Sequence, residues 1–595
     1  MTPNADRPTR VPLPNSLSKA AGSACVVGLT LLATTILASG CNSALRTGWA
    51  EFDRGNYEAA RRAWEPLAQS GNPEAQFFLG TLYFHGQGVP QDREKAAEWY
   101  RRSADQGFAF AQTNLGLMYY EGNGVPQDRD EAAAWYRRAA EQDNPQALNN
   151  LGVMHLLEQV ESEAGSQGRG LIWRAAKKGN AQAQYVLGLA YYSGRGGEQN
   201  DAKAYQWLRK AAEAGVPPAQ HTLGMMYEEG RGVVRVPAQA AEWYRRAAKQ
   251  GYAPAQNNLA VMYLEGNGIA QDYEQARRWF GQAADQGTAT AQFGLGLMYY
   301  EAKGVDRDCG RAAKWFRLAA EHGLSYAQHT LGVMHSEGQG VPQSYEDAAK
   351  WYRRAADQSY GPSQNNLALL YYVGDGVPQD YEAAARWSRS AAEQGVAQSQ
   401  YALGWMYYKG FGVPQDRRKA AEWFERAAEQ GFSQAQTNLG LMHLRGEGVP
   451  PSPSKAAEWL GAAAEGGRAL AQYNLALMQL RGLGVPQNHA EAARWCTEAA
   501  GRGLAQAQHK LGLMYQYGRG VKQDDVSACM WFALAASRGH GEARRCRDLL
   551  TRQMPAEQVN QARRMARRRA EQIRSAGAER PGAEGLAAAS IGFPE

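Results

Sequence analysis

A strict 36-residue repeat constrains this chain more than any other feature. The repeat is clearest from Ala111 to Asp143, in the stretch AQTNLGLMYYEGNGVPQDRDEAAAWYRRAAEQD. Its opening small residue returns in thirteen copies, each 36 residues after the last, at Ala75, Ala111, Ala147, Ala183, Ala219, Ala255, Ala291, Ala327, Ser363, Ser399, Ala435, Ala471 and Ala507. A fixed period of this length is typical of a solenoid, because one helical unit cannot bury its apolar face alone. The repeat therefore predicts one continuous stack of units.

The first pattern in each copy is an amphipathic helix. After the opening alanine, Leu115, Gly116, Met118 and Tyr119 follow at a spacing that puts them on one helical stripe. The glycine in this stripe lets a neighbouring helix approach closely. We therefore expect the apolar face of this helix to pack against the helices before and after it.

A glycine-rich connection separates this helix from the second one. Gly122 suits the left-handed conformation that ends a helix, and Pro126 prevents the helix from continuing. Asp128 can cap the next helix, with Glu131 completing a capping box. The connection lacks the Gly-Lys-Ser/Thr ending of a phosphate-binding loop and follows a helix instead of a strand, so it does not predict nucleotide binding.

The second helix of each copy carries a tryptophan. It occurs in twelve of the thirteen copies, at Trp99, Trp135, Trp207, Trp243, Trp279, Trp315, Trp351, Trp387, Trp423, Trp459, Trp495 and Trp531. A periodic aromatic residue is interpreted as a packing element between units, since stacked units need large apolar faces.

These motifs resemble the Sel-1-like repeat family, a relative of the tetratricopeptide repeat. The shared motif is Ala-x-x-x-Leu-Gly-x-Met-Tyr-x-x-Gly-x-Gly-Val-Pro-x-Asp followed by Ala-Ala-x-Trp, and it extends from Gly71 to about Gly541. The resemblance implies antiparallel helix pairs stacked in a superhelix. The expected fold is an all-α, right-handed superhelical solenoid of about thirteen 36-residue helix-turn-helix repeats.

One copy departs from the motif. Between Leu156 and Leu171 the Gly-x-Gly-Val-Pro sequence is missing, and Leu171 stands in place of tryptophan. We expect a mobile or differently shaped connection there.

The chain also divides into segments around the repeats. We expect a signal peptide at residues 1–40, a capping half-unit at 41–70, the solenoid at 71–542, Arg-rich capping helices at 543–575 and a disordered tail at 576–595. The arginines near the end suit contact with anionic lipid, lipopolysaccharide or an acidic partner; a solvated terminal helix is the alternative.

The first forty residues have the pattern of a targeting segment. A basic stretch precedes an uncharged, mostly apolar run, which ends in small residues before Cys41. This resembles a bacterial lipobox, which implies a diacylglyceryl group on Cys41, although Ala38 stands where that family prefers leucine. An ordinary signal peptide or an uncleaved anchor is the alternative. Each interpretation places the repeats outside the cytoplasm, and Asn42 after the cysteine favours the outer membrane over the inner.

The remaining cysteines are few for an oxidising compartment. Cys529 lies in the second helix of the last full repeat. Cys546 lies in the helix that is expected to pack against it, so a disulfide between the two is one interpretation. Two buried small apolar residues are the other.

Neither charge nor motifs predict catalysis, a cofactor, a metal or nucleic-acid binding. The net charge of +6 resides in the two ends, so the repeats are neutral overall. No metal-binding or nucleophile motif is present, and histidines at one repeat position are separated by whole units. A Ser-x-x-Lys pattern at Ser452 to Lys455 lacks the accompanying motifs of β-lactam enzymes.

Partner binding is the better-supported prediction. By resemblance to tetratricopeptide repeats, varied positions on the first helix face a concave groove. Three sets of candidates occupy them: amides at plus three (Asn114, Asn150, Asn258, Asn366, Asn438, Asn474), aromatics at plus nine (Tyr120, Tyr300, Tyr372, Tyr408) and charges at plus ten (Glu121, Glu265, Glu301, then Lys409, Arg445, Arg481). An amide can pair with the backbone of a bound peptide, or it can cap neighbouring helices.

The charges at plus ten predict a groove that is acidic early in the chain and basic late, unless these side chains point to solvent outside it. We therefore expect a lipid-anchored, periplasmic scaffold that binds envelope proteins or peptide segments. A regulator, or a weak hydrolase acting on peptidoglycan or β-lactams, is the alternative.

Overall fold

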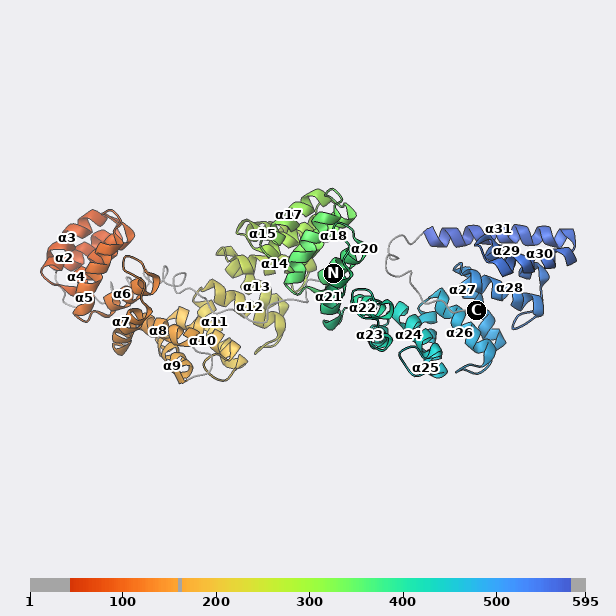
Figure 1. Cartoon of the computed structure of the whole chain (residues 1–595). Helices are drawn as coiled ribbons and strands as arrows, with labels where there is room; N and C mark the ends of the chain where they lie inside the picture. The colour runs from red at the N-terminus through yellow and green to blue at the C-terminus, as the bar shows by residue number, and fades with distance from the viewer. Residues whose placement is uncertain (1–42, 159–162, 579–595) are drawn as a thin grey trace. The chain divides into compact units, whose positions relative to one another are not determined.

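The computed structural model describes residues 43–158 and 163–578, and every regular element in this part of the chain is a helix. The chain divides into two compact units, residues 1–295 (unit 1) and 296–595 (unit 2). Figure 1 shows the succession of helical hairpins in each unit.

The helix bounds follow the 36-residue period. They are α2 Ser43–Asp53, α3 Tyr57–Gln69, α4 Pro73–His85, α5 Arg93–Asp105, α6 Ala109–Glu121, α7 Arg129–Glu141, α8 Pro145–Glu158, α9 Glu163–Lys177, α10 Ala181–Ser193, α11 Asp201–Glu213, α12 Pro217–Glu229, α13 Pro237–Lys249, α14 Ala253–Glu265, α15 Tyr273–Asp285, α16 Ala289–Glu301, α17 Cys309–Glu321, α18 Ser325–Glu337, α19 Tyr345–Asp357, α20 Gly361–Val373, α21 Tyr381–Glu393, α22 Ala397–Lys409, α23 Arg417–Glu429, α24 Ser433–Arg445, α25 Pro453–Glu465, α26 Ala469–Arg481, α27 His489–Gly501, α28 Ala505–Tyr517, α29 Asp525–Ser537, α30 Gly541–Gln553 and α31 Ala556–Ala578. The all-α solenoid of tandem hairpins is thereby confirmed.

The connection between the two helices of a repeat has the expected chemistry, with one correction. Gly122 ends α6 with φ 71°, and the Asp128 carboxylate accepts the backbone N–H groups of Asp130 and Glu131 at 3.0 Å. The capping box is absent, however, because the backbone N–H of Asp128 donates to the carbonyl of Tyr119 and leaves no free donor for Glu131.

Close helix contacts build the core. A Cβ added at Gly116 would lie 2.9 Å from the ring of Tyr136, a fully buried side chain. The glycine therefore admits an aromatic residue, which follows the tryptophan in eight of the twelve repeats that carry one. The tryptophans lie at the edge of the core, and in several units a cation three residues later covers the ring, as Arg138 does at 4.5 Å from the centre of Trp135.

A ladder of buried glutamines, not anticipated from the sequence, links neighbouring helices. The Gln112 side chain donates to the carbonyl of Ala104 at 3.1 Å and accepts from Gln142 at 2.9 Å. It thereby joins α5, α6 and α7. Equivalent pairs, 30 residues apart, are Gln106–Gln76, Gln250–Gln220, Gln286–Gln256, Gln358–Gln328, Gln394–Gln364 and Gln430–Gln400.

The N-terminal end of the stack and the atypical copy are shaped differently from the standard repeat. Residues 43–69 form α2 and α3, a complete hairpin where a half-unit was expected, because Leu45 and Trp49 of α2 pack with Trp64 of α3. In the atypical copy α8 extends to Glu158 and α9 begins at Glu163, so both helices are longer than the standard thirteen residues. The connection itself, residues 159–162, lies outside the described part of the chain.

The C-terminal end is closed by α30 and α31. The helix α31 packs along α29 through Val559, Ala562 and neighbouring residues, and it continues to Ala578, three residues into the segment expected to be a tail. Residues 579–595 lie outside the described part, as do residues 1–42 with Cys41. None of the helices described is long and apolar enough to cross a membrane.

The disulfide between Cys529 and Cys546 is not formed, which corrects that expectation. Both thiols are free: Cys529 is buried in the core between α28 and α29, and Cys546 Sγ lies 3.8 Å from Nε2 of His509. The two sulfurs therefore serve separate packing contacts.

Candidate protein-interaction surface

The plus-three amides do not form an exposed row. Asn150, Asn438 and Asn474 are buried, with at most 2% of their surface exposed. Asn474 donates to the carbonyl of Leu470 at 2.7 Å, in its own helix. For these three residues the expectation of an open amide-lined groove is wrong, because the position lies inside the stack, where Asn150 contacts Tyr136 of the preceding hairpin.

The other three plus-three amides are half-buried. Asn258 lies 3.2 Å from Nε2 of His221 in the preceding repeat, and Asn366 accepts from Asn365 at 3.3 Å. Asn114 is half-buried as well. Local contacts thus account for most of the amide series.

The plus-nine tyrosines lie where one repeat meets the loop of the next. The Tyr300 hydroxyl donates to Gln339 at 2.6 Å, and the Tyr408 hydroxyl donates to Glu447 at 2.7 Å. Tyr120 is half-buried, with the guanidinium of Arg129 5.9 Å from its ring centre. The sequence separation of 39 residues places each of the two hydroxyl contacts across a junction between repeats.

The plus-ten charges occupy the last residue of each first helix. Glu265, Glu301, Lys409 and Arg481 are exposed there, while Glu121 and Arg445 are half-buried. Burial raises the pKa of Glu121, against the opposing effects of Asn123 and Arg93. Carboxylates at a helix C-terminus oppose the helix dipole and the cations complement it. In unit 2 this row changes sign between Glu301 and Lys409.

The structure brings Tyr372, Tyr408 and Lys409 together with aromatic residues that sequence reasoning missed. The rings of Tyr381 and Phe411 stack with centres 5.1 Å apart and planes at 17°, and Tyr372 packs edge-on against both. Trp405 stacks on Tyr408 at 5.9 Å. We call these five rings, Tyr372, Tyr381, Trp405, Tyr408 and Phe411, the aromatic patch.

Cations border the aromatic patch. Lys409 Nζ lies 4.9 Å from the ring centre of Trp405, and the Arg417 guanidinium lies 5.6 Å from that of Tyr408. Burial raises the pKa of Tyr408. The carboxylate of Glu447, which accepts a hydrogen bond from the Tyr408 hydroxyl, raises this pKa further. Lys409 and Arg417 are exposed, whereas Tyr372, Tyr381 and Phe411 are half-buried. Part of the ring surface is therefore open to a partner.

The aromatic patch coincides with two departures from the repeat. Phe411 occupies a loop position that is polar in most other copies, such as Asn123 and Gln339, and Trp405 occupies a position that is leucine in most. Large aromatic residues next to arginine are the composition of energetic centres in protein interfaces. The aromatic residue Phe411 between the two glycines of this loop, where most copies have a polar residue, was the sequence signal that could have located the patch.

Two arrangements considered from the sequence, a metal cluster and the Ser-x-x-Lys pattern, give no sign of catalysis among the described residues. No group of three or more metal-binding side chains occurs among them. Ser452, of the Ser-x-x-Lys pattern, caps α25 by accepting the backbone N–H of Lys455. That serine has a structural role.

The Sel1 repeat family matches twelve segments, which together span residues 73–540: 73–108, 109–144, 181–216, 217–252, 253–288, 289–324, 325–360, 361–396, 397–432, 433–467, 469–504 and 505–540. The stretch left out, residues 145–180, is the atypical copy with α8 and α9.

Solved structures give the same result. The protective antigen c5321 of uropathogenic Escherichia coli, which displays an SLR fold, is 33% identical, with a TM-score of 0.64; the match covers 84% of this chain and 99% of that one. A Sel1 repeat protein from Oxalobacter formigenes is 34% identical, with a TM-score of 0.43, covering 55% and 94%. No match was found among curated proteins.

Proposed function

Because the chain belongs to the Sel1 repeat family, whose solenoids typically mediate protein–protein interactions and are generally non-catalytic, we propose that it is a cell-envelope scaffold. In this role a lipid on Cys41 anchors the chain at the periplasmic side of a membrane, with the outer membrane favoured. The repeats then hold envelope proteins or peptide segments.

The aromatic patch is the observation that carries the binding role. It offers three half-buried rings, Tyr372, Tyr381 and Phe411, bordered by two exposed cations, so a partner segment with apolar side chains and carboxylates would complement it. The location is supported by the pattern of residues 1–40 and by the E. coli relative, which is a protective antigen.

Exchanging the loop at the patch for that of another repeat tests the binding role. The double variant Lys409→Glu/Phe411→Asn converts Lys-Gly-Phe-Gly into the Glu-Gly-Asn-Gly found at Glu121 to Gly124. We expect at least about a tenfold loss of co-purifying envelope protein, since an aromatic anchor and a cation are removed together. The measurement is quantitative mass spectrometry of proteins retained by the full-length lipidated chain.

The control is the reverse exchange in unit 1. Glu265→Lys/Asn267→Phe changes the same two loop positions outside the aromatic patch and should leave the retained proteins unchanged. Equal losses for the two double variants would refute a specific role for the patch, and helicity measured by circular dichroism verifies that both variants fold.

The anchor has its own test. Cys41→Ser removes the thiol that would carry the lipid, so the chain should move from the membrane fraction to the soluble periplasmic fraction. Fractionation followed by immunoblotting measures the shift. Retention of the variant in the membrane would support an uncleaved anchor instead.

A further inference from the structure

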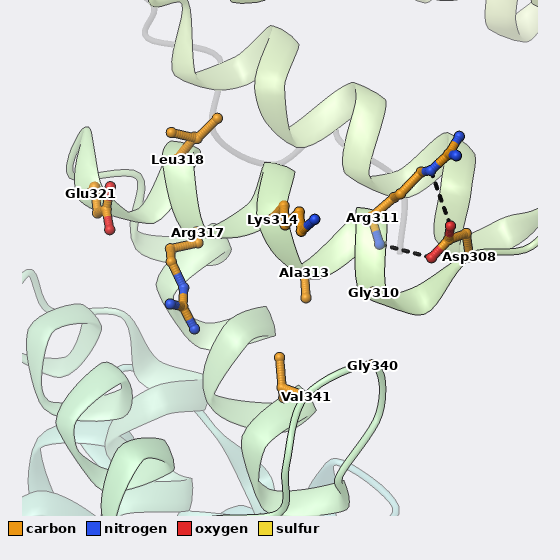
Figure 2. A pocket seen from close by; sticks show the side chains of 10 residues that line it. All are labelled: Asp308, Gly310, Arg311, Ala313, Lys314, Arg317, Leu318, Glu321, Gly340 and Val341. Carbon is orange, nitrogen blue, oxygen red and sulfur yellow. Dashed lines mark hydrogen bonds and ion pairs between the residues drawn. The ribbon is translucent and has the colours of Figure 1, made fainter.

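A hollow of about 680 Å³ lies on the outer side of a second helix in unit 2, away from the aromatic patch. It is lined by α17 and by the loop residues Gly340 and Val341 of the next repeat. Figure 2 shows Arg311, Lys314 and Arg317 along α17, with Val341 across the hollow. We call it the α17 hollow.

Arg317 is available in the α17 hollow because its usual partner is replaced. In other repeats the arginine at this position donates to the hydroxyl of a tyrosine 18 residues later; the pairs are Arg101–Tyr119, Arg245–Tyr263, Arg353–Tyr371 and Arg389–Tyr407. The residue 18 positions after Arg317 is His335, which is buried and whose Nδ1 has no hydrogen-bond partner. Among the described residues, Arg317 therefore has no hydrogen-bond or ion-pair partner.

Leu318 is the second departure. Six repeats carry a lysine or arginine at this position that covers the tryptophan ring at 4.5 to 4.6 Å, in the pairs Arg102–Trp99, Arg138–Trp135, Lys210–Trp207, Arg246–Trp243, Arg354–Trp351 and Arg426–Trp423. In α17 the position holds a leucine that is 41% exposed. The hollow thus contains an apolar contact point where other repeats carry a charge.

The first turn of α17 is the third departure. It contains Gly310 and Arg311 and no acidic residue, whereas α19 carries Glu346 and Asp347 in its first turn. In α19 these two carboxylates bind Lys350 at 2.9 and 3.2 Å. Lys314, the counterpart of Lys350, has no such partner among the described residues.

We propose that the α17 hollow binds a short acidic segment of a protein partner, with carboxylates at Lys314 and Arg317 and an apolar side chain on Leu318. Asp308 and Glu321 lie at the two ends of the hollow. These two carboxylates would repel a continuous polyanion, so a ligand of the hollow must confine its negative charge to a short segment. This favours a peptide over a polyphosphate or an anionic polysaccharide. The hollow is a second contact surface, independent of the aromatic patch.

A repeat-matched pair of variants tests this proposal in the full-length chain. The probe is a fluorescein-labelled peptide Glu-Glu-Leu-Glu-Glu, with Gln-Gln-Leu-Gln-Gln as the neutral comparison, and fluorescence anisotropy at low salt measures binding. Lys314→Gln/Arg317→Gln should weaken the affinity for the acidic peptide about tenfold, through the loss of two charge contacts. Lys350→Gln/Arg353→Gln removes the same charges at the same positions of the next repeat and should weaken it less than about twofold.

A third variant tests why the site is available. His335→Tyr supplies the hydroxyl that captures the equivalent arginine elsewhere, so it should weaken peptide binding about threefold while leaving Lys314 and Leu318 unchanged. The proposal is overturned if both double variants lose affinity equally, if the acidic and neutral peptides bind alike, or if the wild-type chain does not bind the acidic peptide. The peptide assignment would also be overturned if polyphosphate bound more tightly than the acidic peptide and the same variants weakened its binding to the same extent.

Discussion

Adding one methyl group at Gly412 is expected to destabilise unit 2 by at least about 3 kcal/mol. This glycine, the second of its loop, has φ +65°, and a Cβ there would collide with the backbone carbonyl of Tyr381 at the start of α21. Backbone cannot rotate away as a side chain can, so Gly412→Ala combines left-handed strain with a displaced hairpin. Thermal unfolding of the full-length chain, followed by circular dichroism, measures the loss.

Gly395→Ala is the matched control. Gly395 also has positive φ, at +90°, but an added Cβ would meet no atom within 4 Å. Only the conformational strain remains, at about 1 kcal/mol. Similar losses of stability for the two variants would show that packing of the Gly412 loop against α21 contributes nothing to the stability of unit 2.

Acidification is the second perturbation with a large expected effect. Burial lowers the pKa of His329 to about 4, and it lowers the pKa values of His221 and His509 to about 4 as well, with His540 contributing at His509. An unfolded histidine titrates near 6.5, so between about pH 6.5 and 4 the unfolded chain binds more protons than the folded chain. Stability is therefore full above pH 6.5 and falls toward pH 4, by about 2 kcal/mol at pH 5 for His329.

His329→Asn separates this effect from general acid sensitivity. His329 Nδ1 lies 2.9 Å from Ser363 Oγ, and in the following repeat Asn365 accepts a hydrogen bond from Ser399 at 2.7 Å in the same way. The variant should be less stable at pH 7, because ring contacts with Tyr352 and Tyr360 are lost. Its melting temperature should nevertheless fall less between pH 7 and pH 5 than that of the wild type; parallel falls would contradict the assignment.

The repeating parts of the fold could be predicted from the sequence, because each recurring residue has a single structural role within its own hairpin. Gly122 ends a helix, Asp128 begins one, and Gly116 admits an aromatic ring, and each of these contacts lies within one hairpin. The glutamine ladder recurs in seven pairs but joins residues 30 positions apart, and a polar residue at a helix start is easily interpreted as solvated.

The candidate site was less predictable, since it depends on how successive repeats cover one another. Tyr372, Tyr408 and Lys409 do converge, but Asn438 and Asn474 are buried within the stack. Spacing along a helix predicts on which face of the helix a residue lies, but it does not predict whether neighbouring helices cover that residue. The release of Arg317 likewise depends on a contact with the following repeat, which no pattern within one repeat reveals.

The glutamine ladder also has a mechanical consequence. Its rungs are interrupted in unit 1 at Leu148 with Lys178 and at Gln184 with Ala214, and in unit 2 at three successive repeats, where Gly466, Arg502 and Arg538 stand in place of the second glutamine. Under tension, a chain of similar hairpins yields first where it is held by the fewest cross-links. Pulling on the ends should therefore open unit 1 between Leu148 and Ala214 and unit 2 between Gln436 and Arg538, so that the protein extends in steps and the intact hairpins keep their binding surfaces.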